Sequence, residues 1–197
     1  MTLTNSTISN NVVSRYGGGL NVYNGQAQLF NTTIAYNRVQ LGIPKPGPGE
    51  GGGLYVTSPA ALTILDTIIA DDTRGNGIIV PTSDDCVSSG TTGSLGFSLI
   101  KTTTNCFISG PQVGNITGLD PMLGPLQFNG GITETRGLLP GSPAIDAGAT
   151  AGCSGAGGAP ITVDQRGYAR PYGALCDIGA VEYTPNASLT YMPVARK

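Results

Sequence analysis

Two pairs of adjacent aspartates are the residues of this chain with the clearest capacity for chemistry. They are Asp71-Asp72, which Arg74 follows, and Asp84-Asp85. Carboxylate oxygens are preferred ligands of calcium, and a carboxylate pair can also serve as acid and base in hydrolysis. Adjacent residues of a strand point to opposite faces, so each pair supplies only one outward ligand. We therefore expect solvated turn acids, with a weak calcium site as the alternative.

Few other side chains of the chain could take part in catalysis or ligand binding. The chain contains no histidine, which excludes a Ser-His-Asp triad. It contains no tryptophan, and its tyrosines occur singly. Tyr23 and Tyr55 could stack on sugar rings from an exposed face, whereas half-buried packing is the ordinary role of such tyrosines. No cofactor is implied beyond the calcium alternative.

Four cysteines predict two disulfides. Cys86, Cys106, Cys153 and Cys176 form no Cys-x-x-Cys pair, and without histidine a zinc site is improbable. Disulfides imply an oxidising compartment. Of the three connectivities, Cys86 with Cys106 and Cys153 with Cys176 best fits two separate loop regions. Four reduced thiols are the alternative.

A stretch that recurs three times must position these residues. The copies begin at Leu3, Leu29 and Ile64. Each contains a polar residue and then an isoleucine at the same spacing, which gives the ladder Asn5, Asn31, Asp66 and the ladder Ile8, Ile34, Ile69. Each copy leads into a glycine-rich turn and a second apolar element, at 18–22, 52–56 and 76–80.

The repeat predicts stacked β-coils. One unit cannot bury its apolar face alone, but stacking at about 4.8 Å per layer buries a continuous column of Leu, Ile and Val. We expect the repeated Asn and Asp to bond backbone at the bend, each above its counterpart. Residues 41–51, rich in proline, are expected as a loop thrown out from one corner.

Charge and hydropathy argue against two classes of partner, nucleic acid and the membrane interior. The net charge is −2 and basic residues form no run, so nucleic acid is an unlikely partner. No apolar segment is long enough to span a membrane. The chain begins directly in a repeat, so either it is the tail of a longer protein or its first coil stacks on something else. An open coil end is an unpaired sheet edge.

Five motifs in the second half resemble a known module. They occur in the order 94–99, 120–131, 138–148, 164–171 and 176–183, with cysteines at matching places. The chain is similar over residues 1–183 to secreted bacterial "choice-of-anchor Q" proteins, which carry pectate-lyase-like or polymorphic outer-membrane-protein-type repeats. The resemblance implies a right-handed parallel β-helix at the bacterial cell surface or outside the cell. It implies no known reaction.

The C-terminal motifs read as a structural cap. Arg–carboxylate pairs could tie its loops together, and the candidate residues are Asp146, Asp164, Arg166, Arg170 and Asp177. An acidic sugar-binding or catalytic cluster is the alternative. The tail 184–197 contains a short apolar run, Leu189, Tyr191 and Met192, which could add a strand to a neighbouring molecule, serve as a sorting signal or be disordered.

The sequence thus predicts an all-β protein with β-helix coils at 1–100, a loop-rich cap at 101–183 and a tail at 184–197. The expected function is a non-enzymatic, extracellular or cell-surface, adhesin-like structural protein. Its expected partners are further copies of itself, in filaments built by end-to-end coil stacking and tail-strand addition, or a cell-surface polysaccharide. The alternative is a polysaccharide lyase or hydrolase, or a carbohydrate-binding module, on a β-helix scaffold.

Overall fold

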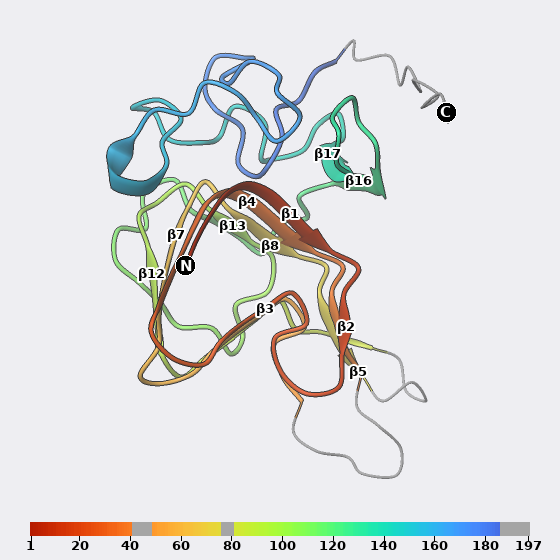
Figure 1. Ribbon diagram of the computed structural model, residues 1–197, viewed down its shortest axis with the longest axis vertical. Helices are drawn as coiled ribbons and strands as arrows, with labels where there is room; N and C mark the ends of the chain where they lie inside the picture. The colour runs from red at the N-terminus through yellow and green to blue at the C-terminus, as the bar shows by residue number, and fades with distance from the viewer. Residues whose placement is uncertain (41–48, 76–80, 186–197) are drawn as a thin grey trace.

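The computed structural model describes residues 1–40, 49–75 and 81–185. Within these ranges the fold is all-β, and the only helical segment is the 3-10 turn η1 (Ala156–Gly158). Three sheets are built mainly from parallel strands. The chain passes through the three sheets in the same order in each successive layer (Figure 1). The sequence-based prediction of an all-β fold is confirmed.

The largest sheet has eight strands and is curled. Its members, in chain order, are β1 (Thr2–Ser9), β4 (Gln26–Ala35), β7 (Ala61–Leu65), β8 (Ile68–Ala70), β12 (Thr91–Ser94), β13 (Leu99–Ile100), β14 (Ile108–Ser109) and β15 (Ile116–Thr117). Every pairing in it is parallel. We call its rungs layers one to five: β1, then β4, then β7 and β8, then β12 and β13, then β14 and β15.

Two smaller sheets complete the layers. One contains β2 (Val12–Val13), β5 (Arg38–Gln40) and β9 (Thr73–Gly75) in parallel, with β10 (Thr82–Ser83) antiparallel at its edge. The other contains β3 (Leu20–Val22), β6 (Leu54–Val56) and β11 (Cys86–Ser88), all parallel. A separate antiparallel hairpin, β16 (Leu123–Gln127) and β17 (Thr135–Leu138), follows the stack.

The isoleucine ladder forms the predicted apolar column. Ile8 pairs with Ile34, and Ile34 pairs with Ile69. Ile34 and Ile69 are completely buried, and Leu29, Leu54 and Ile64 fill the same core. Because parallel layers place equivalent residues above one another, a spacing that recurs in sequence becomes one continuous core.

Two details of the predicted coils are wrong. The strand that pairs with β6 is β11, with Cys86 opposite Leu54, and not the element expected at 76–80, which lies outside the described residues. The insertion expected at 41–51 ends earlier, because Glu50 donates its backbone N–H to Arg15 O at 3.0 Å within the stack. Residues 41–48 lie outside the described ranges.

The layers turn at stacked corners with left-handed backbone. The first corner holds Asn5, Asn31, Asp66, Phe97 and Gly114 at successive layers, with φ from 47° to 70°. Asparagine, aspartate and glycine tolerate this conformation better than other residues. The repeated Asn and Asp of the sequence are therefore corner residues.

Candidate functional site

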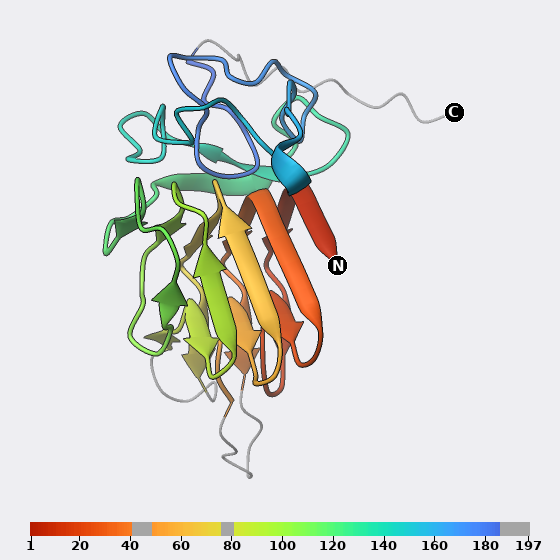
Figure 2. The same ribbon diagram turned by 90° about the vertical axis from the view of Figure 1, so that its left-hand side faces the viewer.

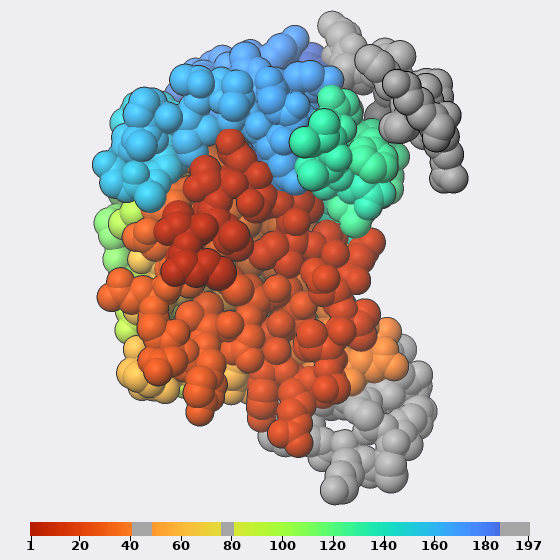
Figure 3. Space-filling model, in the orientation of Figure 1, coloured from red at the N-terminus to blue at the C-terminus, as the bar shows by residue number. Residues whose placement is uncertain are grey.

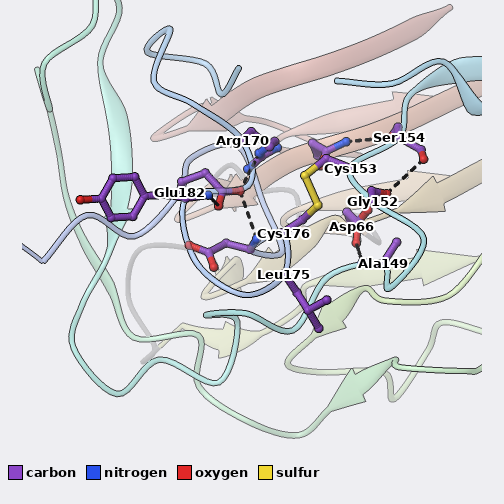
Figure 4. Close-up of a disulfide and its surroundings, with 12 residues drawn as sticks. Asp66, Ala149, Gly152, Cys153, Ser154, Arg170, Leu175, Cys176 and Glu182 are labelled. Carbon is purple, nitrogen blue, oxygen red and sulfur yellow. Dashed lines mark hydrogen bonds and ion pairs between the residues drawn. A yellow bond between two sulfur atoms is a disulfide. The ribbon is translucent and has the colours of Figure 1, made fainter. Parts of the chain in front are cut away.

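The corner residues of the first three layers face the C-terminal part of the chain. Asn5 Nδ2 donates to Val163 O at 2.7 Å, and Asn31 Nδ2 donates to Ser154 O at 2.9 Å. Asp66 Oδ1 accepts from Ala149 N at 2.8 Å, as Figure 4 shows. We expected these side chains to bond the backbone of their own bends. They instead bind the backbone of residues 149–163.

Residues 120–185, which we call the clasp, cover the side of the layers. Ala149, Ser154 and Val163 contact layers three, two and one in turn, so the chain returns along the stack. Figure 2 shows this segment lying across the upper ends of the strands in successive layers. The prediction was a loop-rich cap at 101–183 without a stated position, and the structure places residues 120–185 along the side of the layers. The parallel pairing also continues past residue 100, to Thr117.

Buried arginines hold the clasp to itself and to the first layer. Arg170 Nε donates to Glu182 Oε1 at 2.7 Å, and both side chains are fully buried. The same guanidinium donates to Gly179 O at 2.7 Å and to Asn5 Oδ1 at 3.0 Å. A guanidinium with donors in three directions can connect the clasp to layer one without leaving a buried charge unpaired.

The remaining predicted cap residues divide into two roles. Arg166 pairs with Asp164 at 2.8 Å, as expected. Asp146 Oδ1 accepts from Leu175 N at 2.9 Å, and Asp177 Oδ1 accepts from Asp146 N at 2.7 Å, so these two acids bind backbone and not arginine. Glu182, the partner of Arg170, was missed because nothing in its local sequence distinguishes it.

Both disulfides pair locally, as predicted. Cys86 bonds Cys106 and joins β11 to the segment that precedes β14. Cys153 bonds Cys176 inside the clasp, close to the contacts of Asp66 and Arg170 (Figure 4). Each disulfide therefore fixes a region that carries little regular secondary structure. In the chain-entropy model a loop of this size contributes about 3 kcal/mol.

A second polar ladder lies inside the stack. Asn11 donates its backbone and amide N–H groups to Asn37 Oδ1, and Asn37 donates likewise to Asp72 Oδ1 at 2.7 and 3.0 Å. Asp72 N then donates to Asp85 Oδ1 at 2.8 Å. Gly53 makes room for this ladder, since a Cβ there would lie 2.2 Å from Asp72 Oδ2.

The two aspartates of this ladder are protonated more readily than ordinary carboxyls. Burial raises the pKa of Asp72 well above its usual range, and burial raises the pKa of Asp85 to about 6. Asp72 Oδ2 and Asp85 Oδ2 find no hydrogen-bond partner in the described part of the chain. Burial disfavours the charged form more strongly than the hydrogen bonds to Oδ1 favour it.

The structure separates the four acids considered for calcium. Asp72 and Asp85 are buried in the ladder, whereas Asp71 binds Lys101 Nζ at 2.5 Å beside Asp120. Asp84 Oδ2 accepts from Gly51 N at 2.7 Å. Among the described residues, no three acidic, cysteine or histidine side chains converge to hold a metal ion. These acids are neither solvated turn residues nor one shared site.

Several tyrosines pack against other side chains. Tyr16 and Tyr55 stack with ring centroids 4.6 Å apart on neighbouring layers. Arg136 lies 3.7 Å over the ring of Tyr36 and connects β17 to the corner at Ser9 and Asn10. Tyr23 is 76 % exposed and stands apart from the stacked pair. Of the two tyrosines considered for sugar stacking, Tyr55 is therefore paired with Tyr16, and Tyr23 is exposed.

The first layer presents an open end. Strand β1 pairs with β4 on one edge, and no described strand covers its other edge. Figure 3 shows the first layer facing the viewer, flanked but not overlaid by the clasp. Leu3, Ile8 and Leu20 pack on the core from this layer and are only partly buried. The expected assembly residues Leu189, Tyr191 and Met192 lie outside the described residues.

Known proteins give no independent guide to this site. No family model, curated protein or solved structure matches the chain. Within the described residues no helix is long and apolar enough to cross a membrane.

Proposed function

We propose that this protein is a non-enzymatic, extracellular, adhesin-like scaffold that associates with copies of itself through the open end of its layers. Two disulfides support an oxidising location outside the cytoplasm. We also propose that the chain is related to the secreted bacterial choice-of-anchor Q proteins, which agrees with this location.

We infer that the stacked layers form a right-handed parallel β-helix. Three sheets of parallel strands, visited in a fixed order, are what such a coil requires. Parallel strands need crossover connections, and coils supply them through the other two sheets. The chirality of parallel crossovers favours the right-handed form.

The observation that carries the function is the unpaired edge of β1. An uncovered edge strand is a template for pairing with another chain, and soluble proteins usually block it with charge, proline or a bulge. Residues 2–9 contain none of Lys, Arg, Asp, Glu or Pro. The strand spans eight residues and pairs with β4 on both sides of the corner at Asn5.

The direct test is association as a function of concentration. Sedimentation velocity of the wild-type protein should show larger species growing as concentration rises, and negative-stain images should show elongated particles. Thr4→Lys places a charge on the exposed edge strand and should keep the protein monomeric. Thr91→Lys is the matched control, because Thr91 is also exposed but lies on an inner strand, β12. A wild-type protein that stays monomeric at every concentration would overturn the proposal.

A further inference from the structure

We infer that the copies join head to tail, with β1 of one molecule added in parallel to β14 and β15 of the next. This inference rests on the proposed self-association and adds its polarity and register. The two surfaces differ, so the contact is heterologous and leaves a free end after each addition.

The register follows from the columns of paired residues within the molecule. Thr2 pairs with Gln28, and Gln28 pairs with Thr63. Thr63 pairs with Gly93, and Gly93 pairs with Ser109 in the last layer. Extending this column by one layer places Thr2 of a second copy opposite Ser109.

A second column of paired residues predicts the same register further along the strand. Thr7 pairs with Thr33, which pairs with Ile68, and Leu99 and Ile116 continue the series. Thr7 of a second copy therefore lies opposite Ile116. The stretch of chain that joins the two columns contains more residues in the last layer than in the first. In the last layer its corner is Gly114, with φ 70°. The stack already accommodates this lengthening between layers three and five.

Both ends of the stack of layers expose apolar side chains. At the first layer Val12 is 61 % exposed, and at the last layer Phe107 and Val113 are 76 % and 69 % exposed. Leu119 is exposed where the chain leaves the last layer. The chain leaves the stack after Thr117, so the contact is confined to the eight-stranded sheet and these flanking side chains.

Charge favours head-to-tail contact over a symmetric contact between two first layers. The described residues 1–40 contain Arg15 and Arg38 and no acidic residue. The last layer, residues 106–117, contains no charged residue, and Asp120 beyond it is paired with Lys101 at 2.7 Å. Two first layers would bring like charges together, whereas a first layer on the uncharged last layer avoids this repulsion.

Cysteine cross-linking tests polarity and register together. Thr2→Cys and Ser109→Cys are made in separate proteins, mixed in equal amounts and mildly oxidised, and linked peptides are identified by mass spectrometry. Adjacent parallel strands lie about 4.8 Å apart, within the Cα separation that a disulfide spans. We expect covalent dimers that join position 2 to position 109.

The controls separate the possible failures. Thr2→Cys mixed with Thr117→Cys should not link, because Thr117 is expected opposite Ile8, about 20 Å from Thr2 along an extended strand. Dominant links between two position-2 cysteines, or between two position-109 cysteines, would overturn the polarity. Association by sedimentation without any link between positions 2 and 109 would overturn the register. If no variant and no wild-type sample associates, the proposed function fails instead.

Discussion

Asp66 Oδ1 accepts a hydrogen bond at 2.8 Å from the backbone nitrogen of Ala149, a residue 83 positions later in the chain. The carboxyl is completely buried, and burial raises its pKa to about 7. Its second oxygen, Asp66 Oδ2, has no hydrogen-bond partner in the described part of the chain, nor does Asn31 Oδ1 at the same corner one layer away. Protonation of Asp66 removes the cost of holding a buried charge there, which is why burial raises its pKa.

Replacing Asp66 by asparagine should stabilise the protein at neutral and alkaline pH. The amide oxygen can accept from Ala149 N, and the amide nitrogen can donate where the carboxylate cannot. We expect the free energy of unfolding at pH 8 to rise by about 1–3 kcal/mol, the cost of an unsatisfied buried polar group. Urea unfolding measures it, with Glu134→Gln as the control because Glu134 is an exposed carboxylate. A loss of stability equal at pH 5 and pH 8 would contradict the role of the proton.

The wild-type protein should lose stability as pH rises from about 4 to about 7. The pKa is raised by burial to about 7 in Asp66 and to about 6 in Asp85 and Asp177. The folded state therefore holds protons that the unfolded state has released, and stability falls with pH until the folded pKa is passed. Thermal unfolding at pH 4.5, 6 and 8 checks this order. A melting temperature that rises steadily over this interval would show that these carboxyls are ionised in the fold.

Alanine at Gly53 should be strongly destabilising. A Cβ there would lie 2.2 Å from Asp72 Oδ2 and 2.6 Å from Asp85 O, so the interior ladder must shift. We expect a loss of about 1–3 kcal/mol, the usual cost of overpacking. Gly137→Ala is the matched control, since its nearest neighbour would be 3.7 Å away. Equal melting temperatures for the two variants would argue against a packed ladder at this position.

Arg170→Met should release the clasp from the first layer. The substitution leaves Glu182 as an unpaired buried carboxylate and removes the donors to Gly179 O and Asn5 Oδ1. Breaking a buried ion pair from one side costs about 3–5 kcal/mol. We expect lower stability and faster proteolysis within residues 149–170. Arg15→Met, at an exposed arginine, serves as control and should change neither readout.

The sequence was sufficient to predict the apolar column and both disulfides. Ile8, Ile34 and Ile69 recur at positions that parallel layers bring into register, so a local pattern encodes the contact. The interior ladder also had a signal, because Asn11, Asn37 and Asp72 each follow three residues after those isoleucines. The pattern alone does not give the partners, because each of these side chains bonds its counterpart in the next layer.

The position of the clasp could not be predicted from the repeat. Asn5 and Val163 are 158 residues apart, and the clasp binds the corners through backbone groups that carry no side-chain pattern. The third layer was misassigned for a related reason. After Asp72 the chain forms β9 and β10 before β11, so the element that pairs with β6 lies further along than the repeat spacing suggested.

Hydrogen exchange in strand β1 tests the central claim most directly. The backbone amides of residues 2–9 that point away from β4 should exchange quickly in dilute protein. They should become protected as concentration rises, because this outer edge then pairs with another molecule. Amides of β7 and β8, already enclosed between layers, should stay equally protected throughout. Association without any added protection in β1 would contradict the account.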